Sequence, residues 1–195
     1  MSEKTTARIP LLEREQVGPE VLPLYDALLQ QRGVVPNMFK ALANIPALAQ
    51  GVAAFLKPIV GDGALPGWYK ELIAIRICIL HRFEYGIKAH SLSAQQKGAK
   101  EDQITSLEDF ESGPFSESEK LGFRFADRIH SSDEIDDNFY ASVKARYNDL
   151  QMMELTAVAA AFEFFPRFIG ALGIPVTSVP DSTPQSKLMA ISLRR

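Results

Sequence analysis

One carboxylate and one histidine stand out in the stretch from Glu71 to His90, which reads ELIAIRICILHRFEYGIKAH. Glu71 opens an apolar run in which an acid is costly to bury unless it is paired or used. A carboxylate brought against an imidazole is a minimal proton-transfer device, so Glu71 and His90 are the candidate catalytic pair. The alternative is structural: Glu71 only places charge in the first turn of a helix, and His90 is a satisfied, partly buried histidine.

The order of residues around this pair resembles the core of the carboxymuconolactone decarboxylase and alkylhydroperoxidase D (AhpD) superfamily. That core reads E-L-x-x-x-R, then C-x-x-C-x-x-x-H at the start of the next helix, then a small residue and Gly. The residues that carry the resemblance are Glu71, Leu72, Arg76, His90, Ala94 and Gly98. The two cysteine positions fall on Phe83 and Gly86, so the dithiol of the peroxidase branch is absent.

A cysteine-free branch of the superfamily has Y-E-W-x-x-H at this place, and Glu84-Tyr85 followed by His90 resembles it in part. Gly86 and Ile87 stand where that branch has Glu and Trp. Further likeness lies in V-P-N-x-F, N-x-P-A-L and R-F-x-x-A-L-G, which begin at residues 35, 44 and 167, and it covers roughly residues 7 to 175. The resemblance implies an AhpD-like helical bundle with a central helical hairpin, assembled as a trimer or hexamer.

Helical periodicity dominates the chain, and strand-like alternation is almost absent, which predicts an all-α fold. Pro, Gly and Asn mark the ends of the helices, and Ser116 with Glu119 has capping-box spacing. Helices are expected at about 18–32, 37–43, 46–60, 66–80, 84–97, 116–129, 136–147 and 149–172, with a kink at Pro166. We predict one domain over residues 1–175 and an extended or flexible tail over 176–195, which contains Pro180 and Pro184.

The bulk properties point away from several classes of protein. The 195 residues, 46% of them hydrophobic, suffice for one domain with a sizeable core. A net charge of -3 without clustered Lys and Arg gives no footprint for nucleic acid or an acidic membrane. No apolar run reaches the roughly 20 uncharged residues of a membrane span, and the start of the chain lacks a signal-peptide core. We expect a cytoplasmic protein whose partners are a small-molecule substrate and other copies of itself.

Four further residues are candidates for the site. Tyr85 is a candidate catalytic residue, because a neutral phenol can donate a hydrogen bond to a developing oxyanion; a structural aromatic is the alternative. Glu84, His81 and Arg167 are candidate substrate-binding residues. His81 could reach an anionic substrate from the loop before the motif helix, and Arg167 could bind a carboxylate or simply pair with Glu163 one turn earlier.

Cysteine and histidine usage argues against redox and metal chemistry. Cys78 lies between isoleucines and is expected to be a buried small hydrophobe with a raised thiol pKa. His81, His90 and His130 are dispersed, with no His-x-x-x-His or Glu-x-x-His pair to seed a metal site. His130 is expected only to place a cation at a helix end. The sequence therefore predicts no metal and no cofactor.

These observations favour acid–base chemistry on a small carboxylate or oxo acid: decarboxylation, lactone opening or isomerisation. In that scheme His90 transfers the proton, Glu71 orients it or relays the proton, and Tyr85 or Arg167 holds the enolate or carboxylate. Two alternatives stay open. One is an AhpD-like peroxidase with an altered thiol motif, and the other is a non-catalytic oligomeric scaffold that binds a ligand.

Overall fold

The computed structural model describes residues 7–178, and within this range the chain forms α-helices and a single 3-10 turn, without strands. The all-α prediction is confirmed. In chain order the elements are η1 (Arg14–Gln16), α1 (Leu22–Arg32), α2 (Asn37–Leu42), α3 (Pro46–Val60), α4 (Gly67–Leu80), α5 (Glu84–Gln96), α6 (Glu101–Thr105), α7 (Glu117–Ser131), α8 (Asp137–Lys144) and α9 (Asp149–Leu172).

The expected helices are all present, with shifts at their ends. Helix α1 begins at Leu22 rather than near residue 18, and α8 ends at Lys144 rather than near 147. The capping box that opens α7 is formed, because the Ser116 hydroxyl accepts from the Glu119 amide and the Glu119 side chain accepts from the Ser116 amide. Two short elements, η1 and α6, were not predicted, since three and five residues are too few to show a helical period.

The chain divides into two compact units, which are described separately. In the first, formed within the described range by residues 7–57 and 167–178, Tyr25 is fully buried and donates a hydrogen bond from its hydroxyl to the Leu12 carbonyl oxygen (2.8 Å). The segment that follows α9 packs against the start of α2, where the backbone amide of Asn37 donates a hydrogen bond to the Thr177 hydroxyl (2.9 Å). Thr177 is buried, so the expected C-terminal tail begins in contact with α2; residues 179–195 lie outside the described range.

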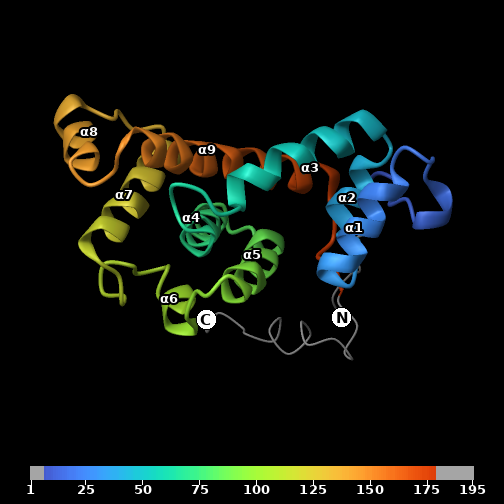
Figure 1. Cartoon of the computed structure of the whole chain (residues 1–195), viewed down its shortest axis with the longest axis horizontal. Helices are drawn as coiled ribbons and strands as arrows, with labels where there is room; N and C mark the ends of the chain where they lie inside the picture. Colours follow the sequence, from blue (N-terminus) through green and yellow to red (C-terminus); the bar gives the residue numbers. More distant parts are fainter. Residues whose placement is uncertain (1–6, 179–195) are drawn as a thin grey trace. The chain divides into compact units, whose positions relative to one another are not determined.

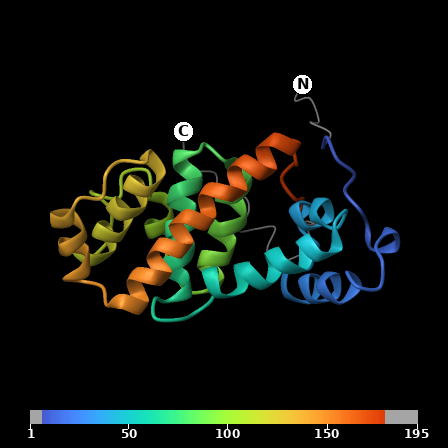
Figure 2. The ribbon, with the colours of Figure 1, turned by 90° about the horizontal axis from the view of Figure 1, so that it is seen from above.

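The second unit, residues 58–166, is built around α4. This helix is buried on almost every side and packs against α5 and α7. Figure 1 shows α4 between these two helices. Helix α9 passes along the α4–α5 pair in Figure 2, and side-chain contacts from Phe162 to His90 and from Glu163 to His81 agree with that view. Helix α9 is also long and apolar enough to span a membrane. Part of this helix is buried inside the protein, however, and the core helix of a globular protein can have the same length and hydropathy.

A tight connection turns α4 back into α5. Arg82 has a left-handed conformation (φ 52°), and the Phe83 amide donates to the Cys78 carbonyl oxygen (2.8 Å). The two helices therefore form an antiparallel hairpin, which brings the beginning of α4 beside the second half of α5. Glu71 belongs to the first of these segments and His90 to the second.

Arg76, the arginine of the E-L-x-x-x-R pattern, links α4 to α7. Its guanidinium makes two parallel hydrogen bonds to the Asp127 carboxylate on α7, each 2.8 Å, and a third to the Leu107 carbonyl oxygen (2.9 Å). A bidentate pair of this kind, largely shielded from water, fixes the angle and distance between α4 and α7. The role of Arg76 in this structure is thus to position the helix that carries Glu71.

Candidate functional site

Glu71 and His90 meet across the hairpin. His90 Nδ1 lies 2.6 Å from Glu71 Oε2, which is the hydrogen-bond distance expected for the pair. The Glu71 side chain is 1% exposed and that of His90 is 18% exposed, so the carboxylate is buried while one part of the imidazole reaches solvent. This arrangement suits a carboxylate that orients a histidine rather than one that meets a substrate directly.

Two residues that the sequence analysis did not single out complete the surroundings of Glu71. The Ser93 hydroxyl donates to Glu71 Oε1 (2.6 Å), and the Lys97 ammonium contacts the same oxygen. Lys97 Nζ also donates to the Val60 carbonyl oxygen (2.6 Å). Ser93 and Lys97 follow His90 by three and seven residues, which places all three on one face of α5. That spacing is the sequence signal that was available for finding them.

The charge state of Glu71 follows from these contacts. Burial alone would raise the pKa of Glu71, but His90 and Lys97 outweigh it and bring the pKa to about 2. Glu71 is therefore ionised at neutral pH and accepts hydrogen bonds only. Nδ1 of His90 must then carry the proton that bonds Oε2, so neutral His90 has Nε2 as the basic nitrogen.

Apolar and weakly polar side chains also lie near this pair. The His90 ring stands edge-on against Phe162 of α9, with ring centroids 4.6 Å apart at 87°. Cys78 is buried, and a Cβ atom at Gly86 would overlap Cys78 Sγ and lie 2.7 Å from Cδ1 of Phe83. The cysteine position of the family motif at residue 86 is thus filled by a thiol that comes from α4. Burial, followed by the nearby carboxylates Glu71 and Glu163, raises the pKa of this thiol, as expected from the sequence.

The other candidate residues lie elsewhere on the hairpin. Tyr85 stacks on Phe83 at the start of α5, with centroids 5.8 Å apart and planes at 18°, so an aromatic packing role is visible and an oxyanion role remains a prediction. Glu84 is exposed and pairs with Lys88 one turn later (2.7 Å). An exposed pair of this kind does not distinguish a substrate-binding residue from a solvated helix start.

His81 and Arg167 differ from what was expected of their surroundings. His81 was expected in the loop before the motif helix, but it caps α4 with its side chain only 15% exposed, and its Nε2 lies 2.8 Å from Glu163 Oε2. Arg167 is exposed, so the premise of a buried arginine was wrong. The buried apolar residues near it in sequence, Phe165 and Ile169, lie on the opposite face of α9, which explains the error. Arg167 also belongs to the first compact unit, whereas Glu71 and His90 belong to the second.

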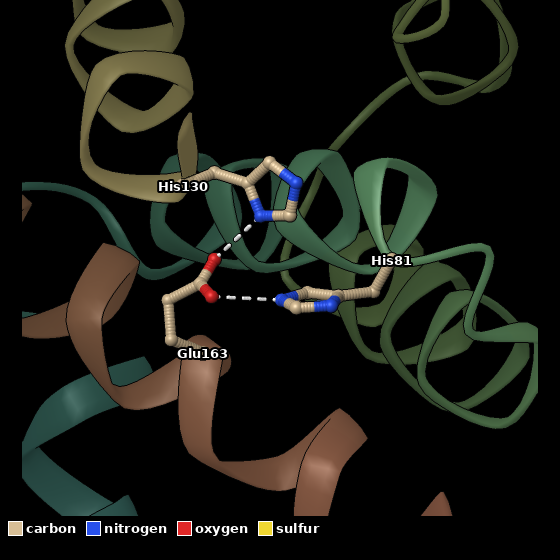
Figure 3. Close-up of side chains that lie close together, drawn as sticks. All are labelled: His81, His130 and Glu163. Atoms are coloured by element: carbon tan, nitrogen blue, oxygen red, sulfur yellow. Dashed lines mark hydrogen bonds and ion pairs between the residues drawn. The ribbon is translucent and has the colours of Figure 1, made fainter. Parts of the chain in front are cut away.

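A second polar cluster joins three helices and is drawn in Figure 3. Glu163 of α9 lies between His81 of α4 and His130 of α7, with His130 Nδ1 2.8 Å from Glu163 Oε1. The two imidazole rings are 4.5 Å apart and nearly perpendicular (86°). His130 therefore does more than place a cation at a helix end. No sequence signal connects these residues, since His130 and Glu163 are 33 positions apart.

Part of the sequence matches a known protein family. Residues 46–111 match the carboxymuconolactone decarboxylase family, a segment that contains Glu71, His90, Ser93 and Lys97. No curated protein sequence matches the chain.

Solved structures share the fold at low sequence identity. A peroxidase-related protein of uncharacterised function from Silicibacter sp. TM1040 superposes with a TM-score of 0.81 and 19% identity, over 91% of this chain and 94% of that one. An AhpD-core, peroxidase-related protein from Ralstonia eutropha JMP134 gives 0.81 and 18%, over 88% and 93%. The debrominase Bmp8, as a cysteine-to-alanine variant in complex with 2,3,4-tribromopyrrole, gives 0.76 and 20%, over 91% and 94%.

Proposed function

We propose that this member of the carboxymuconolactone decarboxylase and AhpD-like superfamily is an enzyme that moves a proton on a small carboxylate or oxo acid, with His90 as the acid–base group. The observation that carries the proposal is the buried, ionised Glu71, which bonds His90 Nδ1 at 2.6 Å. A buried carboxylate held in this way fixes the tautomer and the direction of the imidazole. Nε2 of His90 is then the nitrogen that a substrate would meet.

The contacts of Glu71 indicate which chemical role Glu71 and His90 would each have. His90 and Lys97 keep Glu71 ionised, and Ser93 adds a hydrogen bond, so Glu71 is an orienting group and not the proton donor. In a decarboxylation, the electron pair of the breaking carbon–carboxylate bond passes into an adjacent carbonyl to give an enolate. Carbon dioxide leaves, protonated His90 donates its proton to the enolate carbon, and water restores the proton on His90. In an isomerisation, neutral His90 removes a proton from the carbon next to the carbonyl to give an enolate, and protonated His90 then returns the proton to a different carbon.

The test measures carbon protonation directly. The purified protein would be incubated in D2O with oxaloacetate, 2-oxoglutarate and carboxymuconolactone, and loss of substrate and deuterium incorporation at carbon followed by NMR. With a substrate in hand, His90→Ala and Glu71→Gln are each expected to lower turnover by about a hundredfold or more, the usual scale of acid–base contributions.

Serine-to-alanine substitution at Ser112 is the matched control, because Ser112 is an exposed residue outside the hairpin. Circular dichroism checks that each variant is folded. Normal turnover by folded His90→Ala would contradict the proposal and favour the non-catalytic scaffold.

Thiol chemistry is a second candidate, favoured by one observation. Cys78 Sγ occupies the space beside Gly86, where the superfamily motif has a cysteine, and a debrominase is among the proteins with this fold. Burial raises the pKa of Cys78, which keeps the thiol protonated and weakly nucleophilic, so this candidate ranks below the first. Robust hydroperoxide or dehalogenation turnover that Cys78→Ser abolishes would reverse this order.

A further inference from the structure

His81, His130 and Glu163 are a set of donor atoms that the proposed reaction does not use. They come from the end of α4, the last turn of α7 and the middle of α9, and each side chain is partly buried, at 15%, 24% and 16% exposure. Two imidazole nitrogens and a carboxylate oxygen all lie within 4.8 Å of one another. Three separate helices therefore direct three metal-ligand atoms toward one point, as Figure 3 shows.

We propose that His81, His130 and Glu163 form a binding site for a divalent transition-metal ion such as Zn²⁺. Two histidines and one carboxylate are a common ligand set for such ions, with the remaining coordination positions left to water or a small anion. The site is distinct from the Glu71–His90 pair and does not depend on the function proposed for that pair.

The geometry is close to what an ion requires. Each imidazole nitrogen lies 2.8 Å from a carboxylate oxygen of Glu163. Ligands bound to Zn²⁺ at about 2.0–2.1 Å in a tetrahedral arrangement are separated by about 3.3 Å. Small side-chain rotations would therefore open room for an ion, which would replace the direct contacts between each ring and Glu163.

Electrostatics also favours an ion at this point. The carboxylate of Glu163 is partly shielded from water, with its side chain 16% exposed, and both imidazole rings contact it. Two protonated rings with centroids 4.5 Å apart would repel each other. One divalent ion compensates the carboxylate and attracts both rings, and it would fasten α9 to α4 and α7.

The site also has a connection to the hairpin. Phe162, the residue before Glu163 on α9, packs edge-on against His90 (4.6 Å). An ion that fixes Glu163 would hold this part of α9, and with it the ring beside His90. The metal site is therefore expected to stabilise the second compact unit as well as to bind a ligand.

The test uses tag-free, full-length protein treated with EDTA and then dialysed into metal-free buffer. Zn²⁺ is titrated by calorimetry, and Co²⁺ by its visible absorption bands, which report nitrogen and oxygen ligation directly. We expect one ion per chain and a Tm that rises with free Zn²⁺. His130→Ala and Glu163→Gln should each weaken binding by at least about a hundredfold.

Glu108→Gln is the matched control, because it removes an exposed carboxylate while leaving the three proposed ligands. It should bind Zn²⁺ like the wild-type protein. Wild-type protein that takes up no Co²⁺ into a ligand-field spectrum overturns the proposal, whatever the variants do. Equal binding by folded His130→Ala or Glu163→Gln also overturns it, and the cluster is then a hydrogen-bond network between helices.

Discussion

At the scale of single residues, the candidate site depends on keeping a charge inside an apolar helix. Glu71 is 1% exposed, yet it has three polar partners: His90 and Ser93, each at 2.6 Å, and Lys97. A buried carboxylate without such partners would be protonated at neutral pH. Ser93 and Lys97 thus make the orienting role of Glu71 possible, although neither need touch a substrate.

The first prediction concerns acid stability. Because the pKa of Glu71 is about 2 in the folded chain against about 4.5 when unfolded, ionised Glu71 stabilises the folded state above pH 4.5. This contribution, on the order of 3 kcal/mol, is lost as the pH falls from about 4.5 toward 2. Urea unfolding between pH 7 and 3 measures it. Glu71→Gln should flatten the decline below pH 4.5.

Glu108→Gln provides the control for that experiment, because Glu108 is an exposed carboxylate. Its stability curve should run parallel to that of the wild-type protein. A wild-type slope that Glu71→Gln leaves unchanged would show that the carboxylate is not ionised and paired as the structure has it.

How far the site could be predicted differs from residue to residue. The approach of Glu71 to His90 followed from two adjacent helices joined by a short loop, since such helices must lie antiparallel. The Lys97 contact was readable from helical spacing but was missed. The pairing of His130 with Glu163 depends on how α7 and α9 pack, and no local pattern contains that information.

At the scale of elements, the close packing of α4 against α5 depends on a glycine. Gly86 has no space for a Cβ atom, because Cys78 Sγ and the Phe83 ring already fill it. A cysteine at position 86, as in the family motif, could not be added without displacing Cys78. The glycine at position 86 and the buried Cys78 thiol therefore belong to one packing arrangement.

The second prediction tests this packing. Gly86→Ala should destabilise the chain by about 1–3 kcal/mol, despite the better helix propensity of Ala, because the added methyl overlaps Cys78. Combining it with Cys78→Ala should cost less than the sum of the two single changes. Chemical denaturation of the four proteins gives the coupling. If the two losses of stability were strictly additive, Cys78 Sγ would not be the atom that excludes a side chain at position 86.

Among the elements, long and strongly periodic helices were predictable, and short ones were not. Helix α3 was expected at residues 46–60 and begins and ends there, since Pro46 and the glycine-rich stop after Val60 mark both ends. The five residues of α6 leave too few apolar positions to define a face. The kink expected at Pro166 stays a prediction, although Pro166 does lie inside α9.

At the scale of the whole molecule, one face of α9 is apolar and exposed. Leu150 is 71% exposed, Met153 70% and Phe164 49%, and all three lie on the part of the helix that belongs to the second compact unit. Single exposed apolar residues are ordinary, but several on one helix commonly mark a contact with another chain. This observation agrees with the self-association that the sequence resemblance implies.

The last prediction follows from that face. The protein is expected to form a homo-oligomer, a trimer or a multiple of three, in which α9 contributes to the contact between copies. Light scattering at micromolar concentration measures the mass. Leu150→Glu with Met153→Glu should shift the mass toward the monomer, because charged side chains cannot be buried in an apolar contact without a partner. Asp137→Asn, at an exposed position of α8, should leave the mass unchanged. Wild-type protein that is monomeric would contradict the prediction at once, and an oligomer that survives both glutamates would place the contact on another face.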